Sequence, residues 1–171
     1  AEFGSQYRLR AALGRGELSK IEGGLYSSRP HAGKFEVIAK KYPFAIVAGE
    51  TAHYLHGLTD VIPATIQLAT KRNATRISDS AITQIFVEER LFAPGKTTIE
   101  YEGIKVGIYD RERLLVELLR RSNSVPFDYY KELITSYRRI AESLDFSTIE
   151  SYIGLYKRGA NIFDKLQREV L

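Results

Sequence analysis

The chain has 171 residues, of which 44% are hydrophobic and 27% charged, and this composition excludes both a wholly disordered chain and a collagen-like fibre. It contains no cysteine, which excludes disulfides, thiol nucleophiles, cysteine-bound zinc and iron–sulfur clusters. No apolar run approaches the roughly 18 residues that a membrane helix needs, and the first ten residues lack the apolar stretch of a secretory signal. We therefore expect a soluble cytoplasmic protein that does not contact a membrane.

Charge is unevenly distributed along the chain. Residues 1–41 hold eight Lys/Arg against four Glu, so this segment accounts for the whole net charge of +4, whereas residues 42–171 hold 17 groups of each sign. A basic end on a neutral body is typical of a protein that reaches an anionic partner, usually nucleic acid, through that end. The alternative is an ordinary solvated face.

The first elements resemble the second half of a winged helix. Residues 6–13 favour a short helix, and two glycines end it. Segments 18–22 and 25–27 flank Gly23-Gly24, which is typical of a tight hairpin between two short strands. A complete winged helix would have two more helices before this point, and the string from Glu2 to Ser5 is either native or a cloning scar.

The remainder predicts an α+β fold: a winged-helix remnant over residues 1–30, then a larger domain over 31–171. Within that domain, residues 31–121 form a small mixed α/β sheet unit and residues 122–171 a helical tail. In the sheet unit, strands are expected at 44–48, 64–70, 82–87, 97–101 and 104–109, and helices at 33–42, 49–56 and 111–121. In the tail, the longest helix opens at Asp128 and keeps one apolar stripe from Tyr130 to Leu144; later helices are expected to be capped by Asp145 or Ser147 and by Asn161.

The sequence contains little that points to catalysis. The chain has no GxxxxGK[ST] loop, no GxGxxG after a strand and no G-x-S-x-G elbow. Glu50, His53 and His56 are spaced three apart on one predicted helix, as zinc or iron ligands can be, but His56 precedes Gly57, where an imidazole often caps the last carbonyls. We therefore expect no metal, no cofactor and no catalytic residue.

Two further groups of charged residues suggest a function but are also explained as ordinary solvated side chains. Glu100 and Glu102 with Lys105 faintly suggest a metal-dependent nuclease, although a tight turn favours solvated hairpin residues. The basic run from Lys71 to Arg76 is expected to follow a strand and begin a polar helix, and is most simply solvated. Phosphate-contacting groups instead occur in the order in which a winged helix presents them, and the candidate DNA-binding residues are Gln6, Arg8, Arg10, Arg15, Ser19 and Lys20.

Four stretches together resemble a known family. They are residues 14–27 (GRGELSKIEGGLYS), 48–60 (AGETAHYLHGLTD), 98–106 (TIEYEGIKV) and 108–117 (IYDRERLLVE). In this order they are similar to the AbiEi antitoxins, the antitoxin half of type IV toxin–antitoxin systems in bacterial abortive phage infection. The stretch around His56-Gly57-Leu58 and the one from Asp110 to Leu115 are the more specific ones, and the absent first helices depart from the family pattern.

The resemblance implies a non-enzymatic protein with two tasks. Its winged helix would bind inverted repeats in double-stranded promoter DNA and repress its own operon. Its C-terminal domain would counteract a nucleotidyltransferase toxin without a stable complex. An antitoxin surface would include Asp110, Arg111, Arg113 and Glu117, although Asp110 is also expected to cap a helix and Arg113 to pair with an exposed Glu117. The alternatives are an interaction module with a vestigial wing, and a metal-dependent nuclease or transferase.

Overall fold

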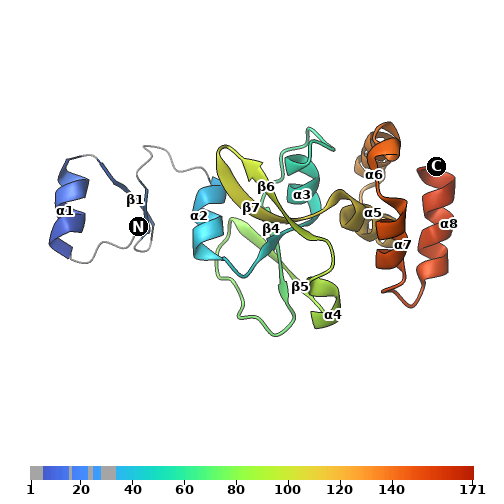
Figure 1. Ribbon diagram of the computed structural model, residues 1–171, viewed down its shortest axis with the longest axis horizontal. Coiled ribbons are helices and arrows are strands. Elements are labelled where there is room, and N and C mark those ends of the chain that lie inside the picture. Colours follow the sequence, from blue (N-terminus) through green and yellow to red (C-terminus); the bar gives the residue numbers. More distant parts are fainter. Residues whose placement is uncertain (1–5, 16, 23–24, 28–33) are drawn as a thin grey trace.

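A computed structural model describes residues 6–15, 17–22, 25–27 and 34–171, and it has an α+β fold (Figure 1). Helix α1 (Gln6–Gly14) and a two-stranded antiparallel sheet of β1 (Ser19–Glu22) and β2 (Leu25–Ser27) lie at one end, apart from the main sheet. The predicted short helix and hairpin strands are therefore confirmed, while the expected Gly23-Gly24 turn lies outside the described residues.

The main sheet has five strands in the order β5-β4-β3-β7-β6. The strands are β3 (Ile46–Val47), β4 (Ile66–Lys71), β5 (Ile82–Val87), β6 (Lys96–Tyr101) and β7 (Ile104–Tyr109). It is mixed, because β3 pairs parallel with β7 and β4 parallel with β5, whereas the other two pairs are antiparallel. The central strand β3 is short and fully buried, as its continuous apolar run predicts.

The β6–β7 hairpin has the register that its alternating pattern predicts. Ile99 lies opposite Val106 and Tyr101 opposite Ile104. Glu102 and Gly103 form the turn with φ angles of 51° and 75°, the left-handed conformation that a tight two-residue hairpin turn requires at both positions.

Three helices lie along the sheet unit. Helix α2 (Lys34–Lys41) packs against β7, and α3 (Gly49–Leu55) packs against β4. The short α4 (Glu89–Phe92), which the sequence did not predict, buries Leu91 and Phe92 beside β4. Apolar residues of β3, β4 and β7 form the core of this unit together with Ala52, Phe92 and Leu114.

Helix α5 (Arg111–Arg120) joins the sheet unit to the helical tail. Its first turn is capped by Asp110, whose carboxylate accepts the Arg113 N–H at 2.7 Å. Leu114 belongs to the sheet core, whereas Leu115 and Leu118 belong to a second core formed with the tail. The predicted divide between residues 121 and 122 therefore falls directly after the helix that both cores share.

The tail contains α6 (Phe127–Arg139), α7 (Phe146–Ile153) and α8 (Gly159–Glu169), with 3₁₀ turns at Ser122–Ser124 and Ala141–Ser143. These helices stack beyond α5 at the opposite end from α1 (Figure 1). Tyr137, at the centre of the predicted stripe, is fully buried, and its hydroxyl donates to the Arg111 carbonyl at 3.1 Å. Within the described ranges, every helix is too short or too polar to cross a lipid bilayer.

Three local predictions are wrong. Residues 72–81 form no helix, because the Gln84 side chain accepts the Ile77 N–H and donates to the Thr75 carbonyl, and so holds this connection as a loop. Helix α6 ends at Arg139 instead of Leu144, since a 3₁₀ turn intervenes before Asp145 caps α7. Helix α8 begins at Gly159, two residues before the expected cap Asn161.

Candidate functional site

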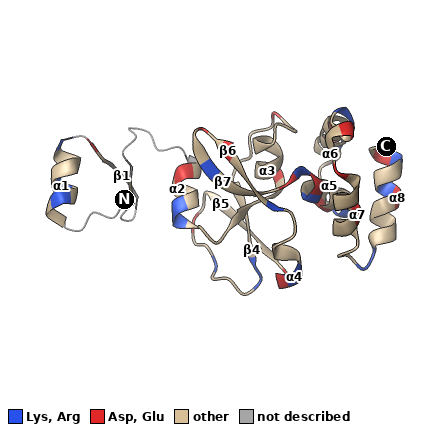
Figure 2. Ribbon diagram, viewed as in Figure 1, with Lys and Arg blue, Asp and Glu red and all other residues tan. Residues whose placement is uncertain are grey.

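The basic amino-terminal element exposes several of its candidate DNA-binding residues. Gln6, Arg8 and Arg10 are exposed on α1, and this helix contains no acidic residue (Figure 2). Arg15 is also exposed, but its guanidinium pairs with the Glu17 carboxylate at 2.7 Å. Ser19 and Lys20 lie in β1, and their side chains are outside the described part.

The second basic run does not extend this surface as a helix. Lys71 ends β4, and its ammonium pairs with the Glu89 carboxylate of α4 at 2.5 Å. Arg72 and Arg76 are exposed in the loop that follows. The run therefore contains one cation in an ion pair and two exposed ones, which agrees with the expectation that it is an ordinary solvated segment.

The three candidate metal ligands point to different surroundings. Glu50 is exposed, and His53 is buried with its ring edge-on to Tyr137. His56 bonds through Nε2 to the Tyr109 carbonyl at 2.8 Å, and so ties the end of α3 to the end of β7 instead of capping its own helix. In the part of the chain that the structure describes, no three His, Asp or Glu side chains gather as metal ligands would.

The hairpin acids are likewise part of the hairpin itself. Glu100 and Lys105 are directly opposite each other in the β6–β7 register, a pairing of opposite charges across antiparallel strands. Glu102 occupies the turn with its positive φ of 51°. Their positions are those predicted for solvated residues of a hairpin.

His53 is an electrically neutral residue at physiological pH. Its side chain is only 5% exposed, and desolvation, with a smaller contribution from the charge on His56, lowers its pKa to about 4. The Gly49 backbone favours the charged ring slightly, yet neither ring nitrogen has a hydrogen-bond partner of good geometry among the described residues.

The structure gathers three of the four candidate antitoxin residues along α5 and its amino-terminal cap. Asp110, Arg113 and Glu117 lie on one side of the helix, and Tyr152 of α7 donates its hydroxyl to the Asp110 carboxylate at 2.8 Å. Burial raises the pKa of Asp110, against the opposing hydrogen bonds from the Arg113 N–H and Tyr152. Arg111, the fourth candidate, is half-buried.

Arg113 is not a surface residue, which corrects the expectation. It is 1% exposed, and its guanidinium lies 5.4 Å from the ring centre of Tyr109 and 5.7 Å from that of Tyr156, within cation–π range. Gly95 allows this burial, because a Cβ on Gly95 would lie 2.5 Å from the Arg113 Cβ, and its φ of +79° suits glycine.

Glu117 is also mostly buried, with a side chain 28% exposed, whereas the sequence predicted an exposed residue. The expected ion pair is confirmed: Arg113 Nη2 lies 2.9 Å from Glu117 Oε1. The same carboxylate accepts the Tyr156 hydroxyl at 2.5 Å and pairs with Arg120 at 2.6 Å. Burial opposes ionisation of Glu117, but these hydrogen bonds and charges outweigh it and lower its pKa.

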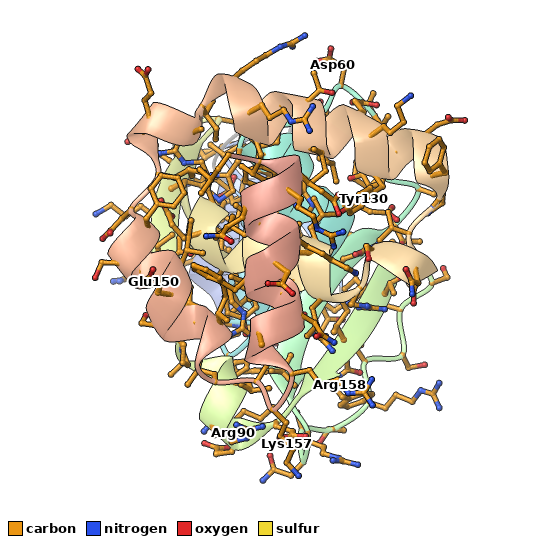
Figure 3. All side chains as sticks on the ribbon, turned by 90° about the vertical axis from the view of Figure 1, so that its right-hand side faces the viewer. Asp60, Arg90, Tyr130, Glu150, Lys157 and Arg158 are labelled. Atoms are coloured by element: carbon orange, nitrogen blue, oxygen red, sulfur yellow. The ribbon has the colours of Figure 1, made fainter. Side chains whose placement is uncertain are left out.

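These side chains line a cavity of about 340 Å³ between the sheet and α5. Ala69 and Ile85 contribute from β4 and β5, Leu114 contributes from α5, and Ala48 lies between β3 and α3. Arg90 lies at the rim, where its Nη1 donates to the Leu155 carbonyl at 2.6 Å. Figure 3 shows Arg90 gathered with Lys157 and Arg158 at one edge of this end of the molecule, opposite Asp60.

The sequence did not predict this cavity. Its lining comes from segments up to about a hundred positions apart, from Ala48 to Tyr156, so no local sequence pattern could predict the cavity. One signal was present: residues 114–119 are apolar except for Glu117, and a helix that is apolar on nearly all sides is buried together with the charges on it. No protein-family model and no curated protein matches the chain.

Proposed function

We propose that this protein is a non-enzymatic antitoxin of the AbiEi type, which represses its own operon by binding promoter DNA and counteracts a nucleotidyltransferase toxin in the cytoplasm. The observation that carries the proposal is the separation of charge: the whole surplus of +4 lies within residues 1–41, and the remaining chain is neutral. The proposal also draws on the resemblance of four ordered stretches between residues 14 and 117 to that family.

The amino-terminal element supports the DNA-binding half of the proposal. Helix α1 exposes Arg8 and Arg10 and carries no acidic residue. The β1–β2 hairpin follows it directly, with Lys20 in its first strand. Cations on a short helix and an adjacent hairpin are suited to contact phosphates along a DNA groove, and inverted repeats are the expected target.

The larger part of the chain is assigned to toxin antagonism. It has two apolar cores joined by α5, so it has the packed interior of an independent unit. Asp110, Arg113 and Glu117 hold this unit together through caps and ion pairs, so the working surface is expected among exposed residues around them, with Arg120 as one candidate.

A reporter assay and a growth assay test both halves. The promoter region of this gene drives a reporter, and a nucleotidyltransferase toxin of a type IV system is induced in the same bacterium. Arg8→Ala with Arg10→Ala should abolish repression but keep growth rescue. The matched control is Arg72→Ala with Arg76→Ala, two exposed arginines in a loop, and it should keep both activities.

Two outcomes contradict the proposal. Repression that persists in the Arg8/Arg10 variant contradicts DNA binding through these two residues of α1. Failure of the wild-type chain to rescue growth, with the protein folded and abundant, removes the antitoxin assignment in favour of an interaction module.

A further inference from the structure

The cavity between the sheet and α5 has the size of a small-molecule site. Its volume is about 340 Å³, near the lower end of the roughly 300–1,000 Å³ that ligand pockets span. A second hollow of about 170 Å³ adjoins it and shares Gly49, His53, Glu117 and Arg121. None of the lining belongs to the amino-terminal element, so a ligand could bind here whether or not the protein binds DNA or counteracts a toxin.

Buried polar groups at the cavity lack partners. Arg113 is 1% exposed, yet its Nε and Nη1 have no hydrogen-bond partner among the described residues. The buried hydroxyl of Tyr129, which lines the adjoining hollow, is also without one. Buried polar groups are nearly always satisfied, and a charged one is costly to leave unsatisfied. Arg113 thus keeps a desolvated positive charge in the cavity wall, which only Glu117 and the flanking tyrosine rings offset, and this charge favours an anion in the cavity.

The charge balance of the lining indicates an anion. Arg113 and Arg120 share the single carboxylate of Glu117, which leaves one positive charge in excess. Arg90 at the rim is neutralised by Glu88 at 3.2 Å. Arg121 lines both hollows and is exposed, so it adds a second positive charge at the entrance, and the exposed Glu50 on the side of the smaller hollow offsets part of it. A group carrying one to two negative charges balances this surplus.

Two opposite sides of the cavity are aliphatic. Ala69 and Ile85 present the sheet side, and Leu91 and Leu114 the helical side. The Tyr156 ring also faces the cavity beside the arginines. We propose that this cavity binds a small phosphate monoester, the phosphate engaging the exposed Arg120 and Arg121 beside the buried charge of Arg113 and the organic part lying against the aliphatic wall. Nucleoside monophosphates, which join a phosphate to a flat base that can pack on an aliphatic wall, serve as the probe.

Calorimetric titration of the full chain with each of the four ribonucleoside monophosphates tests the proposal. At least one should bind. Inorganic phosphate and the matching nucleoside should each bind at least about tenfold more weakly than that monophosphate, because each makes only part of its contacts. The proposal is overturned if none of the four monophosphates binds at millimolar concentration. It is equally overturned if inorganic phosphate binds as tightly as the best of them.

Variants locate the site. Arg121→Ala should weaken binding of the best monophosphate about tenfold, since hydrogen bonds to charged groups are among the stronger ones. The matched control is Arg139→Ala, an exposed arginine of α6 outside the lining, which should bind as the wild type does. Unchanged binding in Arg121→Ala would place the ligand elsewhere and overturn the assignment.

Discussion

Burial of a neutral His53 makes the free energy of unfolding depend on pH in a defined window. The unfolded chain binds a proton at His53 near pH 6.5, whereas the folded chain does so only near pH 4. Between these values the unfolded state holds more protons, so stability falls as the pH falls. At about 1.4 kcal/mol per pH unit, acidification from pH 7 to pH 5 should cost about 2 kcal/mol through this residue.

Urea denaturation of the wild type and of His53→Phe at both pH values measures this cost. Phenylalanine keeps a ring opposite Tyr137 and cannot titrate, and the adjoining cavity gives its slightly larger ring room. Other groups titrate in both proteins, so the difference between the two pH-dependent losses isolates His53. The wild type should lose about 2 kcal/mol more than the variant. Equal losses in the two proteins would refute the neutral, desolvated state of His53.

Three further changes test the packing around α5 and the division of the chain. Glu117→Lys places a third cation beside Arg113 and Arg120. It should lower the free energy of unfolding, measured in urea, by about 3 kcal/mol or more. An unchanged free energy would mean that the carboxylate contributes nothing to stability. Tyr137→Asp buries a charge in the tail core and should leave the chain unfolded by circular dichroism, whereas Tyr137→Phe loses one hydrogen bond and about 1 kcal/mol; similar losses in both would contradict the buried position. A chain of residues 31–171 should fold, rescue growth and lose promoter repression, and a folded fragment without rescue would contradict its antitoxin role.

Much of the fold was predictable because its elements have local signals. Asp110 and Asp145 cap helices as their positions predict, and the alternating residues of β6 and β7 determine both the hairpin and its register. The apolar stripe of α6 identified Tyr137 as a core residue. In each case a short stretch of chain contains the whole physical cause.

The predictions were wrong where the local structure depends on residues that are distant in the sequence. The loop after Lys71 is held by Gln84 from the next strand, and this contact cannot be seen in the loop's own sequence. Glu117 was expected to be exposed because an i,i+4 pair with Arg113 usually is. Its burial depends on Tyr156, thirty-nine positions away. The cavity likewise has no local signal, since strands, α5 and the turn before α8 all contribute to its lining.

Salt-dependent DNA binding tests the central claim most directly. Fluorescence anisotropy with a duplex from the promoter of this gene would follow the binding constant as the salt concentration rises. We predict a steep linear decrease of log K with log salt, because each phosphate contact releases counterions. In the variant with Arg8→Ala and Arg10→Ala the slope should decrease by about two, one for each lost contact. Affinity and slope that both remain unchanged in this variant would contradict DNA binding through the basic amino-terminal element.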